Sequence, residues 1–174
     1  LYCPRWVEAR DKKTGEMLFQ SKNLWVIMDM IKGRPERPSY IDGRLPYVDP
    51  QLRHFDPALP KFPSEDEYNE GSFDSLKVHP TYYDTDYNRH VNNISYIVWL
   101  MESFPYEYLD HNLPEFFDVE WKKQCHLGDE IRVETKKKEN SEEYYTKILR
   151  KCEDGSEEIA FHGITRWKKR VLDK

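Results

Sequence analysis

The decapeptide DTDYNRHVNN, which begins at Asp84, carries most of the side chains in this sequence that could act together chemically. Asp84, Asp86 and Asn88 stand at every second position, and His90 follows before a pair of asparagines. In an extended chain, side chains at alternating positions point the same way. Asp86, Asn88 and His90 are therefore predicted to converge just before the helix that the following residues indicate.

This set of groups suits the hydrolysis of an acyl compound. A carboxylate can deprotonate water, and an amide and an imidazole can hold that water in place. The start of a helix adds unpaired backbone N–H groups and a partial positive charge, which stabilise a developing oxyanion. Ordinary aspartates have a pKa near 3.9 and are weak bases at pH 7, so the surroundings of the site have to strengthen the base that it uses.

Two other interpretations of the decapeptide fit less well. An EF-hand calcium loop needs glycine at its sixth position and glutamate at its twelfth, where this sequence has Arg89 and Ser95. A turn that merely caps a helix needs one or two Asp or Asn side chains, whereas this stretch has five, together with a histidine. We therefore expect a catalytic site that uses neither a metal nor an organic cofactor.

The elements that position these residues begin with a predicted hairpin. The segment PRWVEAR is followed by the turn DKKTGE and then by MLFQSKNLWVIMDM. Its continuous apolar run, residues 24–28, is typical of a strand buried on both faces. Two strands alone are only marginally stable, so the hairpin is expected to join a sheet supplied by the rest of the chain, by a partner or by sequence before Leu1.

The middle of the chain is predicted to be a linker. Seven of the 11 prolines lie between Pro35 and Pro63, and proline at this density opposes both helices and central strands. Aromatic residues are interleaved with the prolines, which indicates that the extended segment packs against something. These residues are Tyr40, Tyr47, Phe55 and Phe62.

The last hundred residues indicate one helix and an antiparallel sheet. SLKVHPTYYD (75–84) is strand-like, and VNNISYIVWLMES (91–103) has helical spacing, with Asn92 or Asn93 as its cap and Pro105 as its stop. Its apolar stripe is predicted to be Val91, Ile94, Ile97, Val98, Leu100 and Met101, with Tyr96 and Trp99 beside it. Four strands are then expected to form a meander joined by HLGD, ENS and EDGS: 116–125, 129–139, 142–153 and 157–170. One helix cannot cover both faces of a sheet, so it should lie on the concave side of a curled one.

Composition excludes several classes of protein. The net charge of −5 gives no support for a general nucleic-acid binder. No apolar run approaches the roughly 20 residues of a membrane span. The three cysteines, Cys3, Cys125 and Cys152, form neither a disulfide framework nor a CxxC metal site, and a reducing compartment is the simplest expectation.

The segment TYYDTDYNRHVNNISYIVWLMESFP resembles the strand-to-helix segment of hotdog-fold thioesterases, and it is closer still to the acyl-acyl-carrier-protein (acyl-ACP) thioesterases of plants and bacteria. VEWKKQC and LWVIMD are similar to further segments of that family. The resemblance implies an α+β hotdog fold, in which a curled antiparallel sheet wraps a helix. It also implies three parts: residues 1–33 as the last hairpin of a first hotdog domain, 34–75 as a linker, and 76–174 as a second, catalytic hotdog domain.

The resemblance also implies roles for individual residues. Asp86, Asn88 and His90 match the polar catalytic motif of the family, and Cys125 matches its cysteine, which we interpret as a small buried residue rather than a nucleophile. Plant members have a catalytic glutamate just before that cysteine, where this sequence has Gln124. The base is then either Asp86 or Glu120, since strand periodicity puts Glu120 and Gln124 on one face. We favour Asp86, with Gln124 positioning the water or the thioester.

The implied activity is hydrolysis of fatty acyl-ACP to free fatty acid and the carrier thiol, in the bacterial cytoplasm or, for a plant protein, in the plastid. An acyl-CoA thioesterase of the single-hotdog type and a non-catalytic acyl-binding module are the alternatives. Acyl carrier protein is the expected partner, and a homodimer is an alternative way to complete the fold. A basic patch for this acidic partner could be formed by Lys122, Lys123, Arg166, Lys168, Lys169 and Arg170. The remaining histidines, with no spaced partners, are expected to be structural: His54, His79, His111, His126 and His162.

Overall fold

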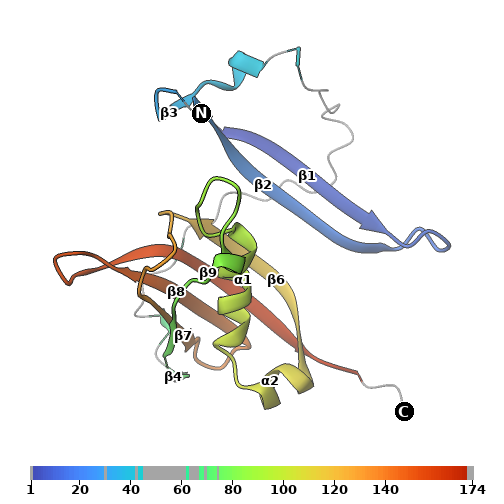
Figure 1. Cartoon of the computed structure of the whole chain (residues 1–174). Coiled ribbons are helices and arrows are strands. Elements are labelled where there is room, and N and C mark those ends of the chain that lie inside the picture. Colours follow the sequence, from blue (N-terminus) through green and yellow to red (C-terminus); the bar gives the residue numbers. More distant parts are fainter. Residues whose placement is uncertain are drawn as a thin grey trace. The chain divides into compact units, whose positions relative to one another are not determined.

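The computed structural model describes residues 2–29, 31–41, 43–44, 62, 67–68, 70–73 and 75–171. The chain divides into two compact units, Leu1–Leu59 and Pro60–Lys174, and each is considered by itself. Figure 1 shows the elements of both. Much of the predicted linker, including Tyr47 and Phe55, lies outside the described residues.

The first unit contains the predicted hairpin. Strands β1 (Tyr2–Arg10) and β2 (Met17–Asp29) pair in antiparallel fashion, and the Asp11 carboxylate accepts backbone N–H groups in the turn between them. A third strand, β3 (Arg34–Glu36), pairs with β2 and is followed by the short 3-10 helix Pro38–Ile41. Because β3 ends the three-stranded order, it accommodates Pro35 at an edge.

Part of the apolar run that was predicted to be buried is exposed in this unit. Within the apolar run 24–28, Trp25 is 53% exposed and Met28 is 46% exposed. Among the described residues of this unit, the run is therefore not buried on both faces. The sequence pattern reports what a strand can bury, whereas actual burial depends on the layer that covers it.

The second unit is built around one antiparallel sheet. Its strands are β4 (Glu70–Ser72), β5 (Leu76–Val78), β6 (Asn112–Trp121), β7 (Ile131–Lys137), β8 (Glu143–Lys151) and β9 (Glu157–Lys169). The order is β4-β7-β8-β9-β6, and β5 also pairs with β7. Helix α1 (Asn93–Glu102) lies across one face of this sheet (Figure 1), and the shorter α2 (Tyr106–His111) follows it.

The predicted meander is correct for β7, β8 and β9 and wrong for β6. β6 pairs with β9 and not with β7, so HLGD is not a hairpin turn. The edge of β7 that a meander would have used is occupied by β4 and β5. Residues 122–130 instead connect β6, at one edge of the sheet, to β7, which lies beyond β9 and β8.

The helix packs through part of the predicted stripe and through the aromatic residues beside it. Val91 and Leu100 are buried, and Ile97 and Met101 pack against the core. Ile94 and Val98 are instead 61% and 45% exposed, and Tyr96 and Trp99 are buried. Tyr96 stacks on Phe161 of β9 with ring centroids 5.7 Å apart. Aromatic side chains bury more area than the aliphatic ones they displace, and this sets the rotation of α1 about its axis.

Part of the predicted linker packs on the other face of the sheet. Phe62 stacks on the His162 ring at 3.8 Å, and Tyr68 is buried, with its hydroxyl donating to Glu143. Tyr40, by contrast, is 62% exposed. Packing by the interleaved aromatic residues is thus confirmed for Phe62. None of the helices in the described part of the chain combines the length and the apolar character needed to cross a membrane.

Candidate active site

The decapeptide folds as a tight turn rather than the extended approach that the sequence predicted. The Asp86 N–H donates to the His90 carbonyl at 2.8 Å, and Thr85 and Val91 form an isolated bridge. Arg89, inside the turn, has a φ of 62°, in the left-handed region. The turn brings the backbone of the predicted catalytic residues together, although by a different geometry from alternation along a strand.

The carboxylate of Asp86 organises this turn. Its Oδ1 accepts the N–H of Asn88 at 2.8 Å and the N–H of His90 at 3.1 Å. Both bonds use the same oxygen, so Oδ2 is not occupied by either of them. Asp86 and His90 are half-buried and Asn88 is exposed. Solvent can therefore reach the motif. Asp86 Oδ2 takes part in neither of the two hydrogen bonds that Oδ1 accepts within the turn.

Asp84 and Asn92 serve as caps on either side of the turn. Asp84 Oδ2 accepts the N–H and the hydroxyl of Thr81, both at 2.7 Å, and its carbonyl accepts the Asn92 N–H at 2.7 Å. The Asn92 side chain accepts the N–H of Ile94 at 3.0 Å, as the N-cap of α1. Of the two predicted caps, the structure selects Asn92. These bonds fix the turn at the N-terminus of the helix.

A second loop, residues 122–129 after β6, lies against the turn. The Val91 N–H donates to the Cys125 carbonyl at 2.8 Å, and His90 forms an isolated antiparallel bridge with His126. The rings of these two histidines stand edge to face, with centroids 5.3 Å apart and an interplanar angle of 78°. His126, expected to be structural, is therefore next to the motif. Its place directly after Cys125 is the one signal in the sequence that could have indicated this.

Cys125 lies in the interior. It is 0% exposed, and its N–H donates to the Tyr96 hydroxyl at 2.9 Å. Burial raises the pKa of the Cys125 thiol, an effect that the neighbouring Tyr96 hydroxyl opposes in part. A thiolate is the nucleophilic form of cysteine, so this environment favours the inert, structural role.

Gln124 and Glu120 do not share a face. β6 ends at Trp121, so strand periodicity does not extend to Gln124, which lies in the loop and is exposed. Glu120 Oε2 instead lies 2.7 Å from Nε2 of His162, and the two residues are register partners on β6 and β9. His162 follows Phe161, which contacts α1, so Glu120 and His162 lie on the sheet face away from the helix.

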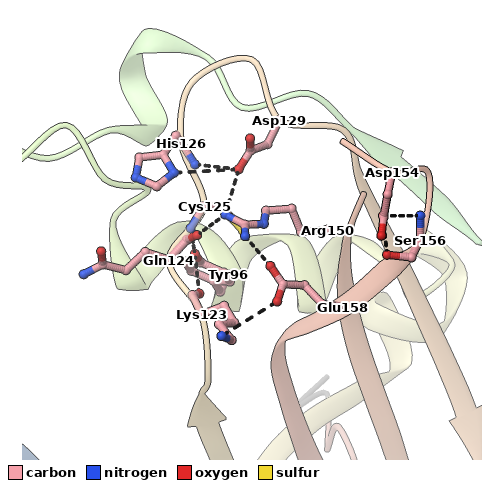
Figure 2. A network of polar contacts seen from close by, with 10 residues as sticks. All are labelled: Tyr96, Lys123, Gln124, Cys125, His126, Asp129, Arg150, Asp154, Ser156 and Glu158. Atoms are coloured by element: carbon pink, nitrogen blue, oxygen red, sulfur yellow. Dashed lines mark hydrogen bonds and ion pairs between the residues drawn. The ribbon is translucent and has the colours of Figure 1, made fainter. Parts of the chain in front are cut away.

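One arginine holds the second loop to the sheet, as Figure 2 shows. Arg150 of β8 donates to the Gln124 carbonyl at 2.8 Å and pairs with Glu158 of β9. Its guanidinium is also 3.8 Å from Asp129 Oδ2. The same Asp129 oxygen accepts the His126 N–H at 2.9 Å. The loop that carries residues 124–126 is therefore tied to two strands through a single guanidinium.

The predicted basic patch is divided in space. Lys122 and Lys123 follow the Trp121 end of β6, while Lys168 pairs with Leu113 at the other end. Eight strand residues separate those ends, which corresponds to about 26 Å. Lys123 lies 3.9 Å from Glu158. Within the described residues no group of three or more His, Cys, Asp or Glu side chains could hold a metal ion.

Comparison with known proteins agrees with this architecture. Residues 67–169 match the family model described as the acyl-ACP thioesterase C-terminal domain. The chain is 27% identical to oleoyl-acyl carrier protein thioesterase 2, chloroplastic, of Arabidopsis thaliana, with 95% of this chain and 51% of that protein covered. It is 26% identical to the chloroplastic dodecanoyl-[acyl-carrier-protein] hydrolase of Cinnamomum camphora, with 95% and 44% covered. The chain thus spans about half the length of these relatives.

Solved structures give the fold. A 12:0-ACP thioesterase from Umbellularia californica superposes with a TM-score of 0.70 at 23% identity, over 96% of this chain and 62% of that one. An acyl-ACP thioesterase from Bacteroides thetaiotaomicron gives 0.69 at 20% identity, over 97% and 63%. The predicted α+β hotdog fold is confirmed.

Proposed function

Because the chain belongs to the acyl-ACP thioesterase family, we propose that it hydrolyses fatty acyl thioesters of acyl carrier protein to free fatty acid and carrier thiol. The observation that carries the proposal is the location of the DTDYNRHVNN turn. This turn lies at the N-terminus of α1 and against residues 125 and 126, inside the region that the family model matches. The relatives are named as thioesterases or hydrolases of acyl carrier protein.

In the proposed mechanism, Asp86 takes a proton from a water molecule whose oxygen attacks the thioester carbonyl. Asn88 and His90 hold that water, and the partial positive charge at the N-terminal end of α1 stabilises the oxyanion. The carbon–sulfur bond then breaks and the carrier thiol leaves. Gln124 has no ionisable group and is assigned to positioning the water or the thioester.

Two other candidates receive lesser roles. Glu120 is the alternative base, but its contact with His162 on the far face of the sheet supports Asp86 instead. Cys125 is assigned to packing, because its burial and raised thiol pKa oppose a nucleophilic role. A well-placed general base contributes about 10²–10⁴ in rate, so the choice of base has a measurable consequence.

The protein is proposed to act in the compartment that contains its acyl carrier protein. This compartment is the cytoplasm of a bacterium, or the plastid if the source is a plant. An acyl-CoA thioesterase is the second enzymatic candidate. A non-catalytic acyl-binding module stays open because Gln124 replaces the glutamate of plant members. Residues 1–33 are proposed to complete a first hotdog domain, with a homodimer as the alternative.

In the test, the full-length protein is assayed with acyl-ACP and with acyl-CoA substrates of several chain lengths. The release of thiol is measured. Wild type is compared with Asp86→Ala, Gln124→Glu and Asp110→Ala, the last a control because Asp110 lies on α2 outside the site. Preference for acyl-ACP, lost in Asp86→Ala and kept in the control, supports the proposal. Activity on acyl-CoA alone favours the second enzyme, activity only in Gln124→Glu indicates a silenced member, and no activity anywhere favours a binding module.

A further inference from the structure

The loop against the motif contains a histidine for which the proposed mechanism has no role. His126 is bridged to His90 through the backbone, and their rings are 5.3 Å apart. Its side chain is 49% exposed, so it lies at the solvent side of the motif. A group in this place can reach both the catalytic turn and a molecule that leaves toward solvent.

Asp129 lies beside both the backbone and the ring of His126. The backbone N–H of His126 donates to Asp129 Oδ2 at 2.9 Å, and the ring Nδ1 lies 4.0 Å from the same oxygen. Arg150 lies 3.8 Å from that oxygen on the other side, as Figure 2 shows. Asp129 therefore provides an ion-pair partner for a protonated imidazole and leaves Nε2 as the nitrogen that can serve a substrate.

The proposed reaction leaves one proton without a donor. Asp86 removes a proton from water, and the departing sulfur needs one to become a thiol. Gln124 cannot supply it, and Glu120 lies on the opposite sheet face against His162. Within the described residues of the turn and the loop, His126 is the histidine with a carboxylate partner.

We propose that His126 is a catalytic residue that donates the proton of its Nε2 to the sulfur of the leaving carrier thiol, with Asp129 as its positioning residue; this role rests on the proposed function. As the carbon–sulfur bond breaks, its electron pair goes to sulfur and the proton moves from Nε2 to that sulfur. Water has meanwhile given its oxygen to the acyl carbon and a proton to Asp86. Asp86 then releases its proton to solvent, and His126 takes up a proton from solvent. Both side chains return to their starting state, so the reaction consumes only the thioester and water.

The leaving group provides the test. A general acid matters when the leaving group is an alkyl thiolate, which is comparatively basic, and matters little for a nitrothiophenolate, which is weakly basic and leaves readily as the anion. The full-length protein is assayed with an acyl-ACP and with the 4-nitrothiophenol thioester of the same acyl chain. We expect His126→Gln to lose about 100-fold in kcat on acyl-ACP and less than about threefold on the aryl thioester.

His111→Gln is the matched control, because His111 also has a neighbouring carboxylate, Asp110 at 3.5 Å, but lies on α2. It should leave both rates unchanged. Asp129→Asn retains the imidazole and should give the same selective loss, about tenfold. This second variant keeps the test decisive if His126→Gln does not fold, which circular dichroism would detect.

Each remaining outcome counts against the role of His126. An equal loss on both thioesters in a folded variant indicates a structural role, and full activity on acyl-ACP removes any role. Both results would leave the thioesterase assignment intact. If the wild-type protein hydrolyses neither thioester, the proposed function fails, and the role of His126 fails with it.

Discussion

Arg89 carries the backbone strain of the turn that contains Asp86 and His90. Its φ of 62° is unfavourable for a side chain with a β-carbon, and its side chain is exposed. Arg89→Val should lower the free energy of unfolding by about 1–2 kcal/mol, because a β-branched residue tolerates this conformation worst. Arg89→Gly should change it by less than about 1 kcal/mol, since relief of strain is offset by a more flexible unfolded chain. Urea unfolding at pH 7 measures both, and equal stability of the valine and glycine variants would contradict the argument.

Cys125 matches a cysteine of the family, and its burial predicts that it packs in the interior and does not act as a nucleophile. The fully buried thiol has a raised pKa, so Cys125→Ala should keep kcat on acyl-ACP within about fivefold, far less than the loss of a nucleophile. The small cavity should lower the free energy of unfolding by about 1–2 kcal/mol. Thiol-release kinetics and urea unfolding of the same preparation separate the two effects. A fall of a thousandfold or more in a folded variant would instead restore Cys125 as a nucleophile.

At the scale of elements, the sequence predicts what local patterns encode. The apolar spacing and the asparagine pair predicted α1 and its cap, which the structure places at Asn92. The buried face was predicted only in part: Ile94 and Val98 are exposed, because the burial of Tyr96 and Trp99 in their place depends on the sheet beneath them. The end of β6 at Trp121 was missed for a similar reason: the chain leaves the strand there, and residues 125 and 126 contact the turn at residues 91 and 90.

Arg150 is the element-scale determinant of the second loop. Arg150→Ala removes its hydrogen bond to the Gln124 carbonyl and its pairing with Asp129 and Glu158. We expect kcat on acyl-ACP to fall about tenfold with little change in KM, because misplacing a catalytic loop by a fraction of an ångström weakens catalysis. Arg150→Lys should be intermediate, since an ammonium cannot reproduce the planar fork.

The control for Arg150 is another arginine on the same sheet. Arg132 of β7 is 30% exposed, against 25% for Arg150, and it also pairs with two carboxylates, those of Glu134 and Glu157. Arg132→Ala should affect stability to a similar extent and leave kcat unchanged. If both alanine variants lose activity equally, the effect belongs to the sheet as a whole and not to the loop.

At the scale of the whole molecule, pairing between distant segments is what the sequence could not supply. The order β4-β7-β8-β9-β6 requires knowing that β5 occupies the edge of β7, a choice that depends on tertiary packing. The same applies to the site. His90 and His126 are 36 positions apart, and only the bridge between their segments brings the rings together. The polar motif itself could be located from the sequence because its residues are neighbours along the chain, and its catalytic role stays a prediction.

The acid sensitivity of the fold should depend on His162, where the sheet meets Phe62. His162 is 6% exposed, with Nε2 bonded to Glu120 and Nδ1 at 2.8 Å from the Tyr145 hydroxyl. Burial lowers the pKa of the His162 imidazole, and the bond to Glu120 opposes this only in part, since that carboxylate is 52% exposed and screened by water. The folded protein therefore binds a proton less readily than the unfolded chain, whose histidines titrate near pH 6.5. The contribution of neutral His162 to the free energy of unfolding is therefore complete above pH 6.5 and is lost as the pH falls below that value.

His162→Gln should flatten this part of the stability profile, because glutamine can hydrogen-bond but does not titrate. Urea unfolding at pH 7.5, 6.5 and 5.5 gives the slope for wild type, His162→Gln and His111→Gln, the last an exposed histidine on α2. Wild type and His111→Gln should lose more stability on acidification than His162→Gln does. Because lowering the pH to 5.5 protonates few carboxylates with ordinary pKa values near 4, a difference in this window is attributable to the histidine. Equal slopes in all three proteins would mean that His162 accepts its proton as easily in the fold as outside it, with Glu120 compensating fully for burial.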